Sequence, residues 1–83
     1  MPLPHVTLFT KPGCHLCEAV EQAVAEVGRR RAFDLEVRNI LDDPADFRNY
    51  QHEIPVVLVN GVEVARHRMT PEELETSLGR GLV

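Results

Sequence analysis

The chain lacks the long apolar segments that would place a protein in a membrane. No segment approaches the roughly 20 apolar residues of a membrane span. Met1-Pro2-Leu3-Pro4 shows neither the charged start nor the apolar stretch of a secretory signal. A clustered basic face is also missing, and the formal net charge is −4, which argues against nucleic acid or an anionic membrane as the main partner. We therefore expect a cytoplasmic protein that binds neither nucleic acid nor membrane.

Cysteine is scarce, since Cys14 and Cys17 are the only two in 83 residues. In a reducing cytosol a structural disulfide is disfavoured, so a close cysteine pair indicates redox chemistry or metal binding. A structural zinc ion would need four ligands, and histidines would have to join the two thiolates. Two thiolates alone suit a soft ion such as Cu(I), as in small heavy-metal chaperone domains, which run β-α-β-β-α-β. Soft-metal binding or transfer is therefore the alternative to redox chemistry, although this chain is predicted to end in a helix.

Internal repeats, low-complexity stretches and linkers are absent as well, so residues 1–83 are expected to form one small domain. Its apolar patterns predict strands and helices in the order β-α-β-α-β-β-α. These elements span residues 5–10, about 14–30, about 33–40, about 45–50, 56–59, 62–65 and about 71–79.

The apolar positions also predict which sides of these elements are buried. On the first helix they form one stripe, which comprises Leu16, Ala19, Val20, Ala23, Val24 and Val27. Leu35 and Val37 are expected to point inward from the second strand, where charged residues alternate with them. Phe47 and Tyr50 are expected to be buried by the short helix.

Two short motifs predict how the last elements are connected. Asn60-Gly61 is typical of a two-residue β-hairpin, and Thr70 followed by Glu73 is typical of a helix capping box. The hairpin requires an antiparallel strand pair, whereas the first strand-helix-strand unit requires parallel neighbours. We therefore expect an α/β fold with a four-stranded mixed sheet and helices on both faces.

The two cysteines lie where the first strand gives way to the first helix, directly after Pro12-Gly13. Unpaired N–H groups and the positive dipole end at a helix start lower the pKa of a thiol, and nearby Lys11 adds positive charge. Cys14 is therefore the predicted nucleophile. Cys17 lies one turn further along, where it is expected to be buried and to resolve a mixed disulfide. The alternative is that both are small buried apolar residues.

Ile54-Pro55 directly precedes the apolar strand at residues 56–59. A proline there forfeits a ladder hydrogen bond. A cis Ile54–Pro55 bond would explain a proline at this position, because it would expose the backbone of Ile54 to an incoming peptide. Only about 5–6% of X–Pro bonds in folded proteins are cis, so the pattern alone leaves both isomers open.

Two segments of the chain carry a resemblance to a known family. They are Lys11-Pro12-Gly13-Cys14-His15-Leu16-Cys17 and Glu53-Ile54-Pro55-Val56-Val57, which precedes the Asn60-Gly61 hairpin. With the elements around them, from His5 to about Leu78, they resemble the glutaredoxin branch of the thioredoxin-like superfamily. The resemblance implies a thioredoxin-like fold, a nucleophilic Cys14, a resolving Cys17 and a cis Pro55 packed against the dithiol. It also implies that the ammonium group of Lys11 assists the thiolate or binds a glutathione carboxylate.

Two regions depart from the pattern of that family. Glutaredoxins usually carry Pro-Tyr between the cysteines, where this chain has His15-Leu16. Many also follow the hairpin with Gly-Gly and an Asp that hold the γ-glutamyl group of glutathione, where this chain has Ala65, Arg66 and His67. Dithiol exchange therefore carries over from the family, whereas the glutathione site is only half present. His15 is either a residue that favours the thiolate when protonated or an exposed residue of the first turn.

We therefore expect a cytoplasmic thiol–disulfide oxidoreductase of glutaredoxin-like type, with no bound cofactor. Cys14 and Cys17 are expected to carry the catalysis, and Lys11, Ile54 and Pro55 to bind the substrate. The expected partners are proteins that contain disulfides, or glutathione-mixed disulfides. Glutathione or a thioredoxin-reductase-type enzyme is expected to supply the electrons.

Overall fold

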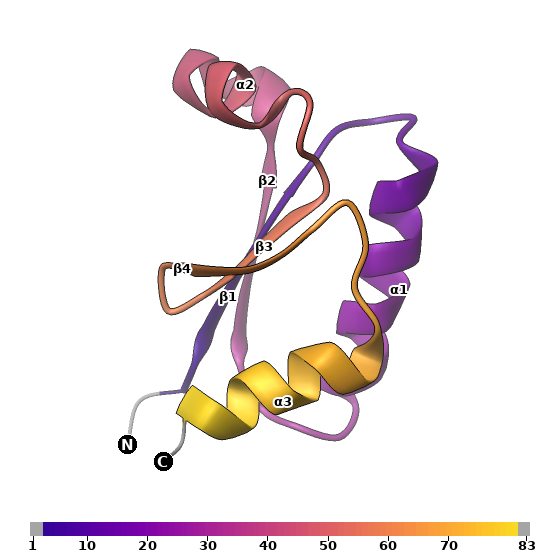
Figure 1. Cartoon of the computed structure of the whole chain (residues 1–83), viewed down its shortest axis with the longest axis vertical. Coiled ribbons are helices and arrows are strands. Elements are labelled where there is room, and N and C mark those ends of the chain that lie inside the picture. Colours follow the sequence, from indigo (N-terminus) through magenta and orange to yellow (C-terminus); the bar gives the residue numbers. More distant parts are fainter. Residues whose placement is uncertain (1–2, 82–83) are drawn as a thin grey trace.

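The computed structural model describes residues 3–81, whose strands and α-helices follow the order predicted from the sequence (Figure 1). The elements are β1 (His5–Thr10), α1 (His15–Gly28), β2 (Asp34–Asn39), α2 (Pro44–Tyr50), β3 (Val56–Val59), β4 (Val62–Arg66) and α3 (Pro71–Gly81). A 3₁₀ turn, η1 (Ile40–Asp42), which the sequence patterns did not predict, connects β2 to α2. In Figure 1, α2 lies at the upper end of the molecule and α3 crosses its lower end.

The four strands form one mixed sheet in the order β2-β1-β3-β4. β1 runs parallel to β2 and antiparallel to β3, and β3 runs antiparallel to β4. In this register Thr10 lies beside Asn39, and Phe9 lies opposite Val56. The loop that follows β1 and the segment that precedes β3 therefore leave the sheet at the same edge, which is formed by the carboxyl ends of β1 and β2 and the amino end of β3. This edge carries both the cysteine pair and Ile54-Pro55.

One face of the sheet packs against α1 and α3 and forms the main core. Side chains alternate along a strand, so β1 and β3 each present every second residue to this face. The buried residues of this core are Val6, Leu8, Val20, Val24, Val27, Val57, Val59, Met69, Leu74 and Leu78. Each such side chain stabilises the fold by roughly 1.5–3 kcal/mol relative to exposure.

The opposite face is covered at one end by η1 and α2. Phe9, Ile40 and Val56 form a small buried cluster there, with Tyr50 packed against it. The rings of Phe9 and Tyr50 stack with their centroids 4.2 Å apart. The prediction that Phe47 is buried was wrong, because Tyr50 is the α2 residue that meets β1, and Phe47 remains 39% exposed. Helices thus lie on both faces, as predicted, but α2 is too short to cover its whole face.

The apolar stripe of α1 also differs from the prediction in its first turn. Leu16 is 54% exposed and Ala19 is exposed as well. Cys17 takes the buried position instead, together with Val20 and the stripe that follows it. The first turn of α1 lies where the loop from β1 leaves the sheet, so Leu16 has no strand beneath it. Ala19 lies on the flank of the helix, away from the sheet.

The inward residues of β2 are only half covered. Leu35 and Val37 are 48% and 50% exposed, although they share a face with Val6 and Leu8. β2 is the outermost strand next to β1, so α1 reaches these side chains from one side only. The prediction that they are buried was therefore wrong.

Both short motifs have the predicted geometry. Asn60 and Gly61 have φ values of 51° and 82°, which is the left-handed pair that a two-residue hairpin of this type requires. At the start of α3, the Thr70 side chain accepts the Glu73 N–H at 3.2 Å, and the Glu73 carboxylate accepts the Thr70 N–H at 3.1 Å. This reciprocal pair is the capping box.

Candidate active site

Cys14 is the N-cap residue of α1. Its backbone is extended, with φ −93° and ψ 109°, and its sulfur accepts the backbone N–H of Cys17 at 3.1 Å. A cap side chain normally accepts a first-turn N–H through oxygen, so here a sulfur takes that position. The sulfur therefore lies at the positive end of the α1 dipole, against a first-turn N–H group. Cys14 is half-buried and reachable from the surface.

Cys17 lies one turn further into α1 and is only 1% exposed. Burial raises the pKa of its thiol above the ordinary value of 9.0, and the neighbouring Cys14 raises it further. Hydrogen bonds from the Thr10 side chain and the Lys11 backbone act in the opposite direction. The two sulfurs are therefore unequal, since Cys14 is accessible at the helix end and Cys17 lies behind it in the core.

A cavity of about 250 Å³ opens beside the two cysteines. It is lined by Thr10, Lys11, Pro12, Gly13, Cys14, Cys17, Glu18, Glu21 and Asn39. Lys11, which the sequence assigned to the site, lies in this lining. Thr10, Glu18, Glu21 and Asn39 were not predicted. Thr10 and Glu18 are near the cysteines in sequence, whereas Glu21 and Asn39 approach the dithiol only through the path of α1 and the parallel register of β1 and β2. Knowing that Thr10 lies beside Asn39 would have identified the latter.

Ile54 and Pro55 lie at the same edge of the sheet but do not line this cavity. Their peptide bond is cis, as the family resemblance implied. Pro55 is buried, and its carbonyl accepts the backbone N–H of His67 at 2.7 Å. The N–H of Ile54 is donated to the Tyr50 carbonyl at 3.1 Å. The Ile54 N–H is therefore not available to an incoming peptide.

The charged residues near β4 are engaged with one another. Arg66 donates to Glu63 at 2.7 and 2.8 Å and to Glu53 at 3.1 Å. The hydrogen bonds from Arg66 hold the pKa of Glu63 below its ordinary value. Nε2 of His67 lies 3.4 Å from the same Glu53 carboxylate. His15 is 96% exposed, and its Nδ1 lies 3.6 Å from Glu18.

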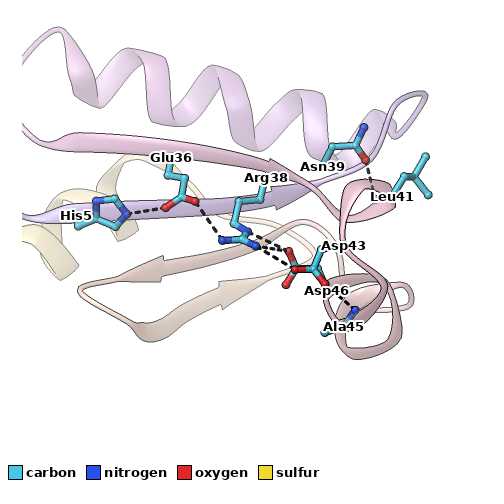
Figure 2. Close-up of polar contacts among 8 residues, drawn as sticks. All are labelled: His5, Glu36, Arg38, Asn39, Leu41, Asp43, Ala45 and Asp46. Atoms are coloured by element: carbon cyan, nitrogen blue, oxygen red, sulfur yellow. Dashed lines mark hydrogen bonds and ion pairs between the residues drawn. The ribbon is translucent and has the colours of Figure 1, made fainter.

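A second polar network joins β2 to η1 and α2 at the same edge (Figure 2). Arg38 donates to Asp46 at 3.0 Å and to Glu36 at 3.2 Å, and it lies 3.5 Å from Asp43. The hydrogen bond and charge of Asp46 raise the pKa of Arg38. Asn39 accepts the Leu41 N–H at 2.9 Å, which holds this cavity-lining residue at the start of η1. The hydrogen bond to Leu41 thus fixes the Asn39 side chain in one wall of the cavity.

The comparison with protein families decides the family of the chain. Residues 5–79 match the glutaredoxin-like domain (DUF836). The chain belongs to this family. The match covers most of the chain and confirms the resemblance to glutaredoxins that the two sequence segments carried.

Other proteins and solved structures are similar to this glutaredoxin-like protein over most of its length. An uncharacterized protein from Mycobacterium tuberculosis is 28% identical, over 95% of this chain and 92% of its own length. A structural genomics target protein from X. campestris is 29% identical, with a TM-score of 0.74 over 90% of this chain and 96% of that chain. Thioredoxin 1 from Thermosipho africanus is 19% identical, with a TM-score of 0.68 over 94% and 93% of the two chains. This last likeness shows a shared thioredoxin-like fold.

Two further findings concern metals and membranes. Within residues 3–81, no three or more His, Cys, Asp or Glu side chains come together as a metal-binding group. The histidines that a structural zinc ion would need beside Cys14 and Cys17 are therefore not gathered in that part of the chain. No helix within the same residues has the length and apolar character to cross a membrane.

Proposed function

We propose that this glutaredoxin-like protein is a thiol–disulfide oxidoreductase, in which Cys14 attacks a substrate disulfide and Cys17 resolves the intermediate. The observation that carries the proposal is the inequality of the two sulfurs. Cys14 caps α1 and accepts an N–H at 3.1 Å, whereas Cys17 is buried one turn behind it. A thiolate is the attacking species in disulfide exchange, and a helix start favours it.

The reaction proceeds in two exchanges. The Cys14 thiolate attacks one sulfur of the substrate, a bond forms between them, and the other substrate sulfur leaves as a thiolate. Cys17 then loses its proton and attacks the Cys14 sulfur, which forms the Cys14–Cys17 disulfide and releases the second substrate thiolate. Two electrons pass from the dithiol to the substrate. Glutathione or a reductase of the thioredoxin-reductase type would return the pair to its reduced form.

The remaining predicted residues act in binding. Lys11 supplies the positive charge of the cavity beside Cys14. The carbonyl of Ile54, whose N–H is already paired, and the buried ring of Pro55 form the second side of the site, at the same edge of the sheet. Proteins that contain disulfides are the proposed substrates, and the cytoplasm is the proposed compartment, since a dithiol of this kind stays reduced there.

Serine variants of the two cysteines test the proposal. The Cys14→Ser variant is expected to lose the ability to reduce hydroxyethyl disulfide, a small neutral disulfide. The Cys17→Ser variant is expected to accumulate one equivalent of mixed disulfide on Cys14, which mass spectrometry detects. The chain has no third cysteine, so the site of the adduct is unambiguous. A Cys14→Ser variant with the full rate would overturn the mechanism.

The same proteins test the metal alternative. Stoichiometric Cu(I) or zinc binding by the reduced protein, together with no detectable disulfide reduction, would replace the redox function by metal transfer.

A further inference from the structure

The cavity beside the dithiol carries more negative than positive charge. Its charged lining residues are Glu18 and Glu21 from α1 and Lys11 from the loop after β1. Glu18 follows Cys14 by four residues, and Glu21 follows Cys17 by four, so each carboxylate lies one turn along the same side of the helix as a cysteine. A molecule that is bound to Cys14 in this cavity therefore lies near two carboxylates and one ammonium group.

Other side chains leave this imbalance largely uncompensated. Among the residues that the structure describes, Glu21 forms no ion pair, and Glu18 has only His15 at 3.6 Å, which is charged only when protonated. The arginines at this edge of the sheet are already paired. Arg38 is held by carboxylates of β2, α2 and its cap, and Arg66 is held by Glu53 and Glu63.

We propose that Glu18 and Glu21 make the site selective for protein disulfides with Lys or Arg beside the cysteine, and against disulfides with carboxylates there. The proposal rests on the proposed function and names the substrate class of the same site. The chemical steps are those already given, so the selectivity acts on the encounter and on the first exchange. One pair of unit charges about 6 Å apart, in largely hydrated surroundings, changes a rate or affinity by about three- to tenfold. Because both carboxylates are exposed, salt should weaken the effect.

Two disulfide-linked peptides measure this selectivity. They share one sequence except that Lys flanks the cysteine in one and Glu in the other. Their rates of reduction by the reduced protein are each divided by the rate with dithiothreitol, which corrects for intrinsic reactivity. The Lys peptide is expected to react about tenfold faster on this scale at low salt, and the preference is expected to shrink in about 0.5 M NaCl. Oxidised glutathione, which carries carboxylates, is expected to behave like the Glu peptide.

Neutral variants assign the selectivity to the two carboxylates. Glu21→Gln is expected to reduce the preference about threefold, and the Glu18→Gln/Glu21→Gln double variant, which leaves only the charge of Lys11, to abolish or reverse it. Each variant is normalised to its own rate with hydroxyethyl disulfide. Glu26→Gln is the matched control, because Glu26 is exposed on the same helix but lies outside the cavity lining. Its preference is expected to equal that of the unmodified protein.

The outcomes separate this proposal from the function on which it rests. A protein that reduces hydroxyethyl disulfide but shows equal corrected rates for both peptides would overturn the selectivity and leave the oxidoreductase intact. A preference that persists in the double variant would also overturn it. A protein that reduces none of the disulfides would instead overturn the proposed function.

Discussion

The hydrogen bond from Thr10 to the Cys17 sulfur offers a sensitive test of the two unequal thiols. Burial and Cys14 raise the pKa of Cys17, and the Thr10 side chain is among the few groups that lower it. Thr10→Val keeps the shape of the side chain and removes the hydroxyl. The loss of this hydrogen bond is therefore expected to raise the pKa of Cys17 further and to lower the Cys17 thiolate population at neutral pH.

The expected change in rate is smaller than the change in population. A more basic thiolate is a better nucleophile, and a Brønsted slope of about 0.4–0.5 recovers roughly half of the loss on a logarithmic scale. The resolving step should therefore slow in Thr10→Val, but by less than the thiolate population falls. The attack by Cys14 should keep its rate, because the affected hydrogen bond belongs to Cys17.

A chromogenic aromatic disulfide separates the two steps, since each step releases one coloured thiolate. In stopped-flow measurements the first phase depends on substrate concentration and reports Cys14, whereas the second does not and reports Cys17. Thr7→Val is the matched control, because Thr7 lies on the same strand but on the opposite face of the sheet. An unchanged second phase in Thr10→Val, or a slower first phase, would refute the assignment of Thr10 to the resolving sulfur.

Two further predictions concern stability. Leu74 is fully buried, whereas Leu16 is 54% exposed. Leu74→Ala is therefore expected to lower the free energy of unfolding by about 2–5 kcal/mol, whereas Leu16→Ala should change it by less than about 0.5 kcal/mol. Urea titration of both variants checks this, and equal losses would contradict the burial pattern. Folding raises the pKa of Cys17 above its ordinary value of 9.0, so the unfolded chain releases this proton at a lower pH than the folded protein does. The free energy of unfolding of the reduced protein should therefore decrease as the pH rises above 9.0. A Cys17→Ala variant should lack this part of the decrease, and identical pH profiles for the two proteins would show that folding leaves Cys17 unperturbed.

Features that depend on neighbouring residues could be predicted from the sequence. The Asn60-Gly61 turn and the Thr70–Glu73 capping box require only the chemistry of adjacent residues, and both have the expected geometry. The order of elements followed from apolar periodicity in the same way. The cis bond before Pro55 is different, because local chemistry left both isomers open and only the family resemblance implied it.

Features that depend on packing between distant segments could not be predicted. Periodicity marks Leu16 and Phe47 as apolar positions on their helices, but it does not reveal that neither meets the sheet. The alternation of apolar and charged residues predicts that Val37 is buried, yet Val37 lies on an edge strand that α1 covers from one side only. Asn39 joins the cavity only because β2 pairs in parallel with β1. Each of these outcomes depends on the strand order, which no local pattern specifies.

The strand order also decides which parts of the molecule can open without disturbing the dithiol. The cysteine loop follows β1 and the Ile54-Pro55 segment precedes β3, and these are the two interior strands of the sheet. Edge strands exchange their amide hydrogens through local fraying, whereas interior strands open only with the core. The amides of β1 and β3 should therefore be the slowest to exchange, and β2 and β4 can fray while the two halves of the site stay together. The sulfur chemistry thus stays on the part of the fold that opens last, while the two edge strands fray without separating the cysteines from Pro55.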